Sequence, residues 1–253
     1  MVSMLDQIHR GRERGARRTM IYGTEGIGKS TFGAGAPNPI FLPTEDGVRD
    51  IDTAKFPRIT TYDQALAALA DLYEGQHDFK TVVVDTLDAL ERMIWAEVAK
   101  KFRKTSIEEI GYAKGYTFAL DYWKGFLEGL DALREKKGMG CVLIAHSQVQ
   151  RFANPEGDDY DRYAPKLHKL AAGLVQEWAD EVFFATYKVY VKVEGEGFRK
   201  AGKAVGTGER TLHTAATPAF HAKNRLALPP ELPLSWEAYA SHFTDKQAKK
   251  AKA

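Results

Sequence analysis

Short apolar runs alternate with amphipathic segments along the first three quarters of the chain. The apolar runs are four to six residues long and are bounded by glycine, proline or charged residues, as is typical of strands buried on both faces of a sheet. They occupy residues 19–22, 39–42, 80–84, 140–145 and 181–185. Between them, apolar side chains recur at helical spacing in residues 63–73, 87–102 and 116–137. Strands that alternate with helices predict an α/β fold with a mainly parallel sheet flanked by helices.

The pattern changes after Ala185. Within residues 187–193, valines alternate strictly with larger or charged residues, and a Glu-Gly-Glu-Gly sequence follows at 194–197. Further strand-like pieces through Leu212 predict an antiparallel β extension near the C-terminus. No linker separates two cores. We therefore expect one domain over residues 1–243, followed by a basic, flexible tail over 244–253.

Composition narrows the class of protein. The chain has 253 residues, of which 44% are hydrophobic, and about 70% of its surface can be buried on folding. The single cysteine, Cys141, excludes a disulfide framework and a multi-cysteine zinc site, and we expect it to pack in the core. No apolar run is long enough for a membrane span, and the N-terminal residues lack the apolar region of a secretory signal. These features predict a cytoplasmic protein with no membrane partner.

The formal net charge of +2 implies no partner by itself. Five arginines occur in the first 18 residues and four lysines in the last eight. Basic ends can bind phosphate backbones. We expect them to be solvated tails, with nucleic-acid binding as the alternative.

A phosphate-binding motif follows the first predicted strand. The sequence GTEGIGKST matches G-x-x-x-x-G-K-[ST] and comprises Gly23, Thr24, Glu25, Gly26, Ile27, Gly28, Lys29, Ser30 and Thr31. Its glycines allow successive backbone N–H groups to surround a phosphate. Lys29 would contact the β- and γ-phosphates of ATP, and the Ser30 hydroxyl would bind Mg²⁺. The alternative is a glycine-rich turn with an incidental lysine. Because the motif lies between a predicted strand and a segment that can be helical, we favour the nucleotide site.

An acidic residue ends the third predicted strand. Asp85 follows three valines, and ligands of α/β proteins bind beyond the carboxyl ends of parallel strands. A carboxylate at this position holds Mg²⁺ beside the nucleotide, usually through water. The alternative is that Asp85 caps the helix that begins at Thr86 or Leu87. With a P-loop upstream, we favour the metal role.

Two further polar residues are expected at the same edge of the sheet. Glu45 lies just past the second strand and is the candidate that orients water against the γ-phosphate, with Asp46 as the fallback. His146 ends the fourth strand, where it would face the γ-phosphate and report its loss to residues 148–166. That polar stretch is too long for an ordinary connector and is expected to be functional or mobile. The alternatives are an exposed loop carboxylate and a strand-end histidine without a role.

Together, GTEGIGKST, the acid after IFLPT, VVVDTLDAL and IAHSQVQ resemble the RecA/RadA/KaiC-like ATPase core over about residues 17–235. Within that group the chain is similar to the small phage-encoded single-strand annealing ATPases of the Sak-four type. If a phage encodes it, the expected compartment is the cytoplasm of the host cell. The resemblance implies a RecA-type P-loop fold and ATP hydrolysis at the subunit interfaces of a homo-oligomer. It also implies binding of single-stranded DNA, with a single-strand-binding protein as a further partner.

The resemblance assigns roles to individual residues. Lys29 and Ser30 would bind phosphate and magnesium, Glu45 would activate water, and Asp85 would be the second metal acid. His146 would be the γ-phosphate sensor, where bacterial RecA uses glutamine.

One element near the C-terminus looks like a contact between subunits. Lys223-Asn-Arg225 is similar to the K-x-R element by which one subunit of KaiC- and replicative-helicase-like rings reaches into its neighbour's site. An arginine supplied in this way stabilises the charge that builds on the leaving phosphate. The alternative is a basic pair on a solvated edge.

The DNA-binding surface is harder to locate. Residues 147–166, where such proteins place a DNA loop, contain three cations against four acids, which is unfavourable for a polyanion. The basic residues of the predicted β extension are the other candidates: Lys188, Lys192, Arg199, Lys200 and Lys203. DNA binding therefore depends on the resemblance more than on charge.

The sequence thus predicts an ATP-hydrolysing protein that oligomerises, binds single-stranded DNA and promotes annealing or recombination. One alternative is a helicase- or partition-like NTPase that acts on a protein partner. The other is a small-molecule P-loop kinase, for which Arg151 and Arg162 are the only lid-like arginines.

Overall fold

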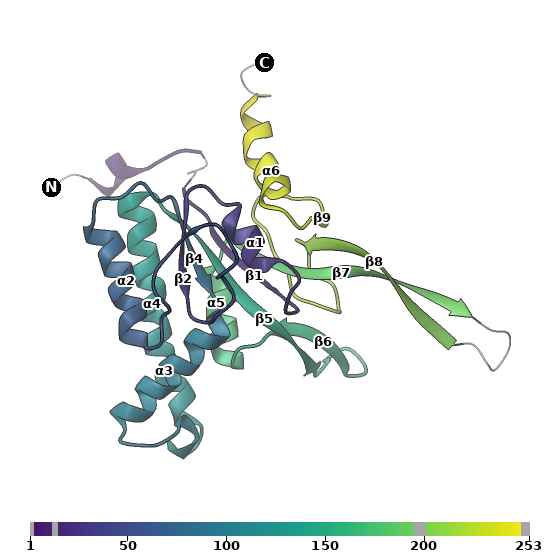
Figure 1. Ribbon diagram of the computed structural model, residues 1–253, viewed down its shortest axis with the longest axis horizontal. Coiled ribbons are helices and arrows are strands. Elements are labelled where there is room, and N and C mark those ends of the chain that lie inside the picture. Colours follow the sequence, from purple (N-terminus) through teal and green to yellow (C-terminus); the bar gives the residue numbers. More distant parts are fainter. Residues whose placement is uncertain (1–2, 12–14, 195–200, 249–253) are drawn as a thin grey trace.

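The computed structural model describes residues 3–11, 15–194 and 201–248. Within these residues the chain forms a nine-stranded sheet in the order β3-β2-β4-β5-β1-β7-β8-β9, with β6 paired to β5 beyond this path (Figure 1). The parallel strands are β3 (Ala54–Lys55), β2 (Pro39–Pro43), β4 (Thr81–Asp85), β5 (Gly140–Phe152), β1 (Arg18–Gly23) and β7 (Glu181–Glu194). The antiparallel strands are β8 (Ala201–His213), β9 (Glu231–Pro233) and β6 (Tyr160–Pro165). This is the fold of a P-loop NTPase, and the predicted fold class is confirmed.

Helices cover both faces of the sheet. The described helices are α1 (Lys29–Ala34), α2 (Tyr62–Glu74), α3 (Leu87–Lys101), α4 (Lys114–Lys137), α5 (Lys169–Trp178) and α6 (Trp236–Ala248), with two short 3₁₀ helices, η1 (Met4–Gln7) and η2 (Ile107–Glu109). None of these helices combines the length and the apolar character needed to cross a membrane.

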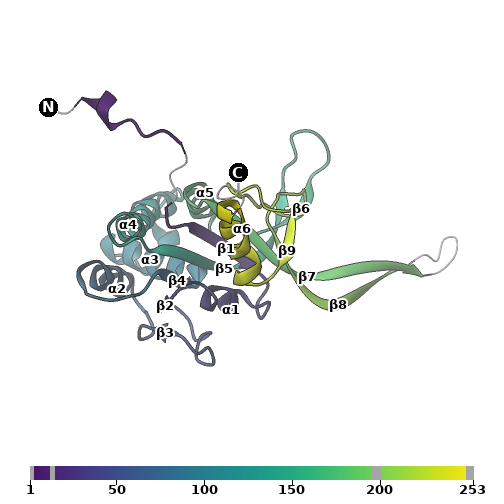
Figure 2. The same ribbon diagram turned by 90° about the horizontal axis from the view of Figure 1, so that it is seen from above.

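The alternation of side chains along each strand divides the core in two. Met20 and Tyr22 of β1 pack with α2, α3, α4 and α5, whereas Ile21 between them packs with α1 and α6. The valines of β4 divide in the same way. Figure 2 shows α3, α4 and α5 on one side of the sheet and α1 on the other. Each large apolar side chain buried in this way contributes about 1.5–3 kcal/mol to the free energy of unfolding, so the central strands are held from both faces.

All five predicted strands and three predicted helices are present, and two of the strands, β5 and β7, are longer than predicted. The apolar run 181–185 and the alternating segment 187–193 are one strand, β7, because its pairing with β8 continues through Thr186. A register irregularity lies between Tyr187 and Val189. The predicted antiparallel extension is confirmed as β7, β8 and β9.

The polar stretch 148–166, which the sequence predicts to be functional or mobile, forms two paired strands. β5 continues to Phe152, and β6 returns antiparallel to it, with Gln150 opposite Arg162. We call residues 147–165 the β5–β6 hairpin. The hairpin was missed because its strands are mostly polar and all but Pro165 are partly or fully exposed, so they lack the apolar pattern of the buried sheet.

Several predicted features fall partly or wholly outside the described residues. These are the turn beyond Glu194, the side chains of Lys192, Arg199, Lys200 and Lys203, and residues 12–14 of the arginine-rich N-terminus. At the other end α6 continues to Ala248, and residues 249–253 of the predicted tail lie outside.

Candidate functional site

The P-loop begins where β1 meets its neighbour β7 closely. A Cβ atom on Gly23 would stand 2.3 Å from the carbonyl oxygen of Ala185, so no side chain fits there. The loop ends at Gly28, whose φ of 108° is a conformation that residues with a side chain rarely adopt. α1 starts at the next residue. The loop lines a cavity of about 410 Å³.

Lys29 is buried and forms no ion pair with an acidic side chain among the described residues. Its side chain belongs to a residue only 5% exposed, and its Nζ donates hydrogen bonds to the carbonyl oxygens of Gly23 (3.0 Å) and Thr24 (2.8 Å). Burial lowers its pKa, although nearby acids such as Asp85 oppose the shift. Lys29 forms no ion pair with any described residue. A buried ammonium group is costly unless it is paired, so this position suits an anionic ligand such as the phosphates of ATP.

Ser30 and Asp85 lie together beside Lys29. The Ser30 hydroxyl donates to Asp85 Oδ2 at 2.6 Å. Burial raises the pKa of Asp85, and the Ser30 hydrogen bond partly offsets this. Asp85 is the last residue of β4, and the N-cap of α3 is Thr86, so Asp85 is not the helix cap. A hydroxyl and a carboxylate are oxygen ligands of the kind that Mg²⁺ binds, and these two residues would hold it.

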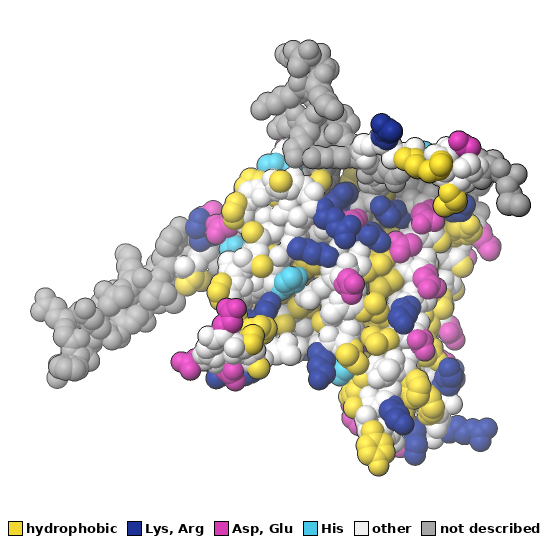
Figure 3. Space-filling model, turned by 180° about the vertical axis from the view of Figure 1, so that it is seen from behind, with side chains coloured by type: hydrophobic (Ala, Val, Ile, Leu, Met, Phe, Trp, Pro, Cys, Tyr) yellow, Lys and Arg dark blue, Asp and Glu magenta, His cyan; other side chains and the backbone are white. Residues whose placement is uncertain are grey.

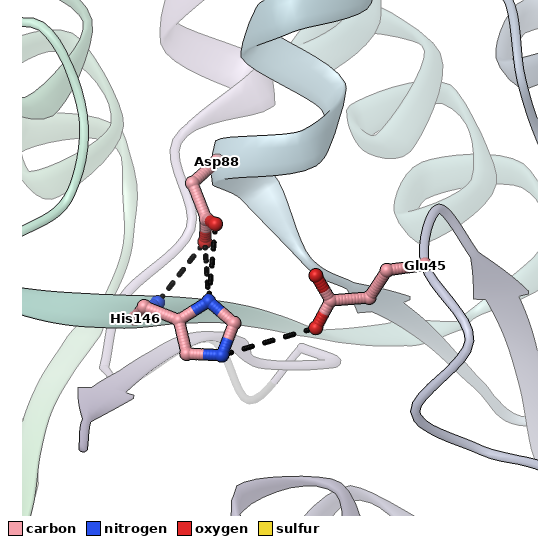
Figure 4. A group of neighbouring side chains, drawn as sticks. All are labelled: Glu45, Asp88 and His146. Atoms are coloured by element: carbon pink, nitrogen blue, oxygen red, sulfur yellow. Dashed lines mark hydrogen bonds and ion pairs between the residues drawn. The ribbon is translucent and has the colours of Figure 1, made fainter. Parts of the chain in front are cut away.

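Glu45 and His146 approach each other at the carboxyl edge of the sheet (Figure 4). Glu45 lies in the segment after β2, and its Oε1 is 3.8 Å from Nε2 of His146 in β5. That distance is longer than a hydrogen bond. Both residues line the cavity of the P-loop. The fallback residue, Asp46, instead directs its carboxylate to Arg49 (3.1 Å) and Arg58 (3.6 Å).

Asp88 was missed by the sequence reasoning. It lies in the first turn of α3 and accepts hydrogen bonds from the His146 backbone N–H (3.1 Å) and from Nδ1 (3.0 Å). Burial alone would raise the pKa of Asp88, but these bonds outweigh it and lower the pKa to about 2. The Asp88 hydrogen bond in turn raises the pKa of His146. A sequence signal existed. An acid three residues after Asp85 falls in the first turn of the helix that follows the strand, and that turn begins at the same edge of the sheet.

Both ends of the β5–β6 hairpin are attached to α3. Asp88 holds His146 at the first end, and the backbone N–H of Lys166 donates to the carbonyl oxygen of His146 (2.8 Å). One turn further along α3, buried Glu91 accepts from the backbone N–H of His168 at 2.9 and 3.1 Å. The segments just before and just after the hairpin are therefore held by two carboxylates of the same helix, Asp88 and Glu91.

Arg210 approaches the P-loop from the opposite side. It lies in β8, and its Nη1 stands 3.0 Å from where a Cβ on Gly28 would be. Its side chain is exposed and forms no ion pair with the described residues. Nothing in the sequence indicated this contact, because the two positions are far apart along the chain and meet only through the pairing of β7 with β1 and β8.

Lys223 and Arg225 do not line the cavity of their own chain. Lys223 pairs through its backbone with Val182, which is level with Met20 near the start of β1, at the opposite edge of the sheet from the P-loop. Arg225 donates to Asp180 at 3.1 Å, and the Lys223 ammonium group donates to the carbonyl oxygen of Glu177. Their role in a neighbouring subunit stays a prediction.

Residues 16–226 match the sequence model of a known family, which is described as an AAA domain. The match spans every residue of the cavity described above. No curated protein matches the chain.

Proposed function

The chain belongs to the AAA domain family of P-loop ATPases, and from this premise we propose that it binds ATP with Mg²⁺ and hydrolyses the bond between the β- and γ-phosphates. We propose further that it does so as a RecA-like homo-oligomer on single-stranded DNA, where it promotes annealing or recombination. The observation that carries the ATPase proposal is the buried Lys29, which has no ion pair among the described residues and lines one cavity with Asp85, Glu45 and His146.

The residues divide the chemistry between them. Lys29 balances the charge of the β- and γ-phosphates, while Ser30 and Asp85 hold the metal. When bound, Mg²⁺ neutralises phosphate charge. Glu45 orients the attacking water and accepts its proton. His146, fixed by Asp88, presents Nε2 to the same space, which suits a group that responds to the terminal phosphate.

The RecA-like part of the proposal is supported by the motifs and by the position of Arg225. Because Arg225 lies at the edge remote from its own P-loop, it can serve a P-loop only in another copy of the chain. Its side chain is 58% exposed and therefore accessible to a neighbour. Membership of the Sak-four type and interaction with a single-strand-binding protein rest on the sequence resemblance.

The first test measures ATP turnover with and without poly-dT. We expect severalfold stimulation by poly-dT and loss of turnover in Lys29→Ala. DNA binding should weaken as salt rises, because cations are released from the phosphate backbone. Turnover that poly-dT leaves unchanged would contradict the DNA-linked function. If phosphate were then transferred to a metabolite, the kinase alternative would replace it, and stimulation by a protein would favour the helicase- or partition-like alternative.

The second test mixes two inactive variants. Arg225→Ala and Lys223→Ala should each hydrolyse ATP slowly while they retain nearly normal ATP affinity. A mixture of Arg225→Ala with Lys29→Ala should recover part of the turnover, because some interfaces then combine an intact P-loop with an intact arginine. No recovery would argue against a shared site, and loss of ATP affinity in Arg225→Ala would make the side chain structural.

A further inference from the structure

The ends of α3 and α4 project away from the sheet. We call residues 101–118, which connect the two helices and include η2, the α3–α4 tip (Figure 1). Ile107 and Ile110 are buried in the main core cluster, so the tip is anchored to the domain. Its other side chains are mostly exposed. In Figure 3, dark-blue and yellow side chains gather on this projecting end.

The tip carries exposed cations that form no ion pair with the part of the chain that the structure describes. Lys101, Arg103, Lys104 and Lys114 are all exposed, and none of them forms an ion pair among the described residues. The two acids of the tip are engaged locally, Glu108 with the Tyr116 hydroxyl and Glu109 with the Thr105 hydroxyl. Glu109 also interacts electrostatically with Lys104. The four cations outnumber the two acids of the tip, and this excess of positive charge is available to an anionic partner.

Exposed aromatic rings accompany these cations. Phe102 and Phe118 stack with centroids 4.8 Å apart and remain 38% and 36% exposed. Tyr112 is 97% exposed, with its backbone in the left-handed region at φ 59°. A large aromatic side chain gains little by standing in water, so a partner that covers the rings would bury substantial apolar area.

The β5–β6 hairpin offers a contrast. Its Arg151 pairs with Asp159 (3.8 Å) and Asp161 (3.7 Å), and Arg162 lies over the ring of Phe152. Both hairpin arginines are thus engaged within the chain. Of the four tip cations, only Lys101 makes a comparable contact among the described residues, over the ring of Tyr122 (5.8 Å).

We propose that the α3–α4 tip is a surface that binds single-stranded nucleic acid. Its lysines and arginine contact phosphates, and its exposed rings stack on bases, which is the combination that sequence-independent single-strand binders use. Duplex DNA hides its bases and would use only the cations. The choice of DNA as the physiological strand rests on the proposed function.

The test measures binding of a labelled oligo-dT of roughly 30 nucleotides by fluorescence anisotropy, in ATP and at salt concentrations between about 50 and 200 mM. The charge variant combines Lys101→Ala, Arg103→Ala and Lys104→Ala. A control triple, Lys80→Ala, Lys136→Ala and Lys169→Ala, removes the same charge from exposed residues elsewhere. The stacking variant is Tyr112→Ala, which removes a side chain too exposed to support the fold.

We expect the charge variant to weaken binding and to reduce the salt slope by about 2, or about 0.7 for each lost phosphate contact. Tyr112→Ala should weaken binding to oligo-dT at least about fivefold and leave duplex binding unchanged. The control triple should retain most of the affinity. If the tip variants bind like the control triple, the tip assignment is wrong while DNA binding stands. If the wild type hydrolyses ATP but binds no oligo-dT, both the tip assignment and the DNA-linked function fail.

Discussion

Charged residues lie at both ends of the parallel strands. At the amino edge, where the strands begin, they pair with each other, whereas at the carboxyl edge, where the strands end, several of them face a cavity. At the amino edge, carboxylates and arginines pair with each other: Glu181 with Arg17, and Asp180 with both Arg18 and Arg225. Tyr239 adds a hydrogen bond to Glu181. At the carboxyl edge, Lys29 is buried without an ion pair among the described residues, and Glu45 and His146 face a cavity.

The pKa values reflect this difference. Burial would raise the pKa of Asp180, but the Arg18 hydrogen bonds outweigh it and lower the pKa, so the charge is stabilised within the chain. Burial lowers the pKa of Lys29 and raises that of Asp85, so each is less stable in its charged form. The charges of Glu181 and Asp180 are thus balanced within the chain, whereas that of Lys29 has no ion-pair partner among the described residues.

The largest effect expected is at the carboxyl edge. Glu45→Gln should lower ATP turnover by roughly 10²- to 10⁴-fold, because the amide cannot accept the proton of the attacking water. ATP affinity and the free energy of unfolding should change little. Steady-state kinetics and urea unfolding measure the two quantities. Asp46→Asn is the control, and a larger fall in that variant would transfer the role to Asp46.

At the amino edge the same type of change should affect stability instead. Glu181 is fully buried, and Glu181→Gln leaves Arg17 without its counter-ion. Removal of one partner of a fully buried pair costs about 3 kcal/mol or more of unfolding free energy. Because the Arg17 side chain is 27% exposed, we expect a loss of about 2 kcal/mol. Urea unfolding should show this loss while ATP affinity is unchanged. Glu97→Gln breaks an exposed pair with Lys100 and should cost less than about 1 kcal/mol. Equal losses in the two variants would contradict the comparison.

Asp88 lies at the carboxyl edge but is paired within the chain, with His146. Its contribution to the free energy of unfolding should depend on pH. The pKa of Asp88 is lowered to about 2, so its contribution is present above the unfolded value near 4 and is lost as pH falls toward 2. The pKa of His146 is raised, so the same interaction is complete below the unfolded value near 6.5 and is lost as pH rises through the folded value.

Asp88→Asn should therefore lower the unfolding free energy by about 2 kcal/mol near pH 5. The loss should be smaller near pH 9, because the positive charge of His146 decreases as pH rises through its raised pKa. Urea unfolding of the wild type and of Asp88→Asn at the two pH values measures the loss of unfolding free energy. An equal loss at both would mean that Asp88 acts only as a neutral hydrogen-bond acceptor.

The smallest effect is expected at Arg210. If its guanidinium contacts the nucleotide beside Gly28, Arg210→Ala should lower the affinity for ATP and the affinity for ADP to a similar degree, roughly tenfold each. The effects are similar because Arg210 approaches from the side away from Glu45 and His146. Arg210→Lys should retain part of the affinity. A fall in turnover at unchanged affinity would assign Arg210 to catalysis instead.

The sequence predicted the buried parts of the fold well. The strands around the P-loop are continuous apolar runs, and their shared direction was enough to bring Asp85, Glu45 and His146 to one edge. The exposed hairpin was missed because its pairing depends on backbone hydrogen bonds between polar residues. Periodicity of apolar residues does not detect such pairs.

The remaining parts of the site depend on contacts between distant segments. Arg210 reaches Gly28 only because β7 and β8 continue the sheet past β1. The amino-edge network likewise joins Arg17 and Arg18 to residues more than 160 positions away. Side-chain pairs of this kind have no local signature, so their identification required the three-dimensional structure.

The attachment of the β5–β6 hairpin to α3 has a mechanical consequence. β5 runs without interruption from the buried sheet through His146 to Phe152, so there is no hinge between the ring of His146 and the hairpin. The far end is tied to the same helix through His168 and Glu91. A rotation of α3 would therefore displace both ends of the hairpin in the same direction, and the hairpin would move with the helix as one unit.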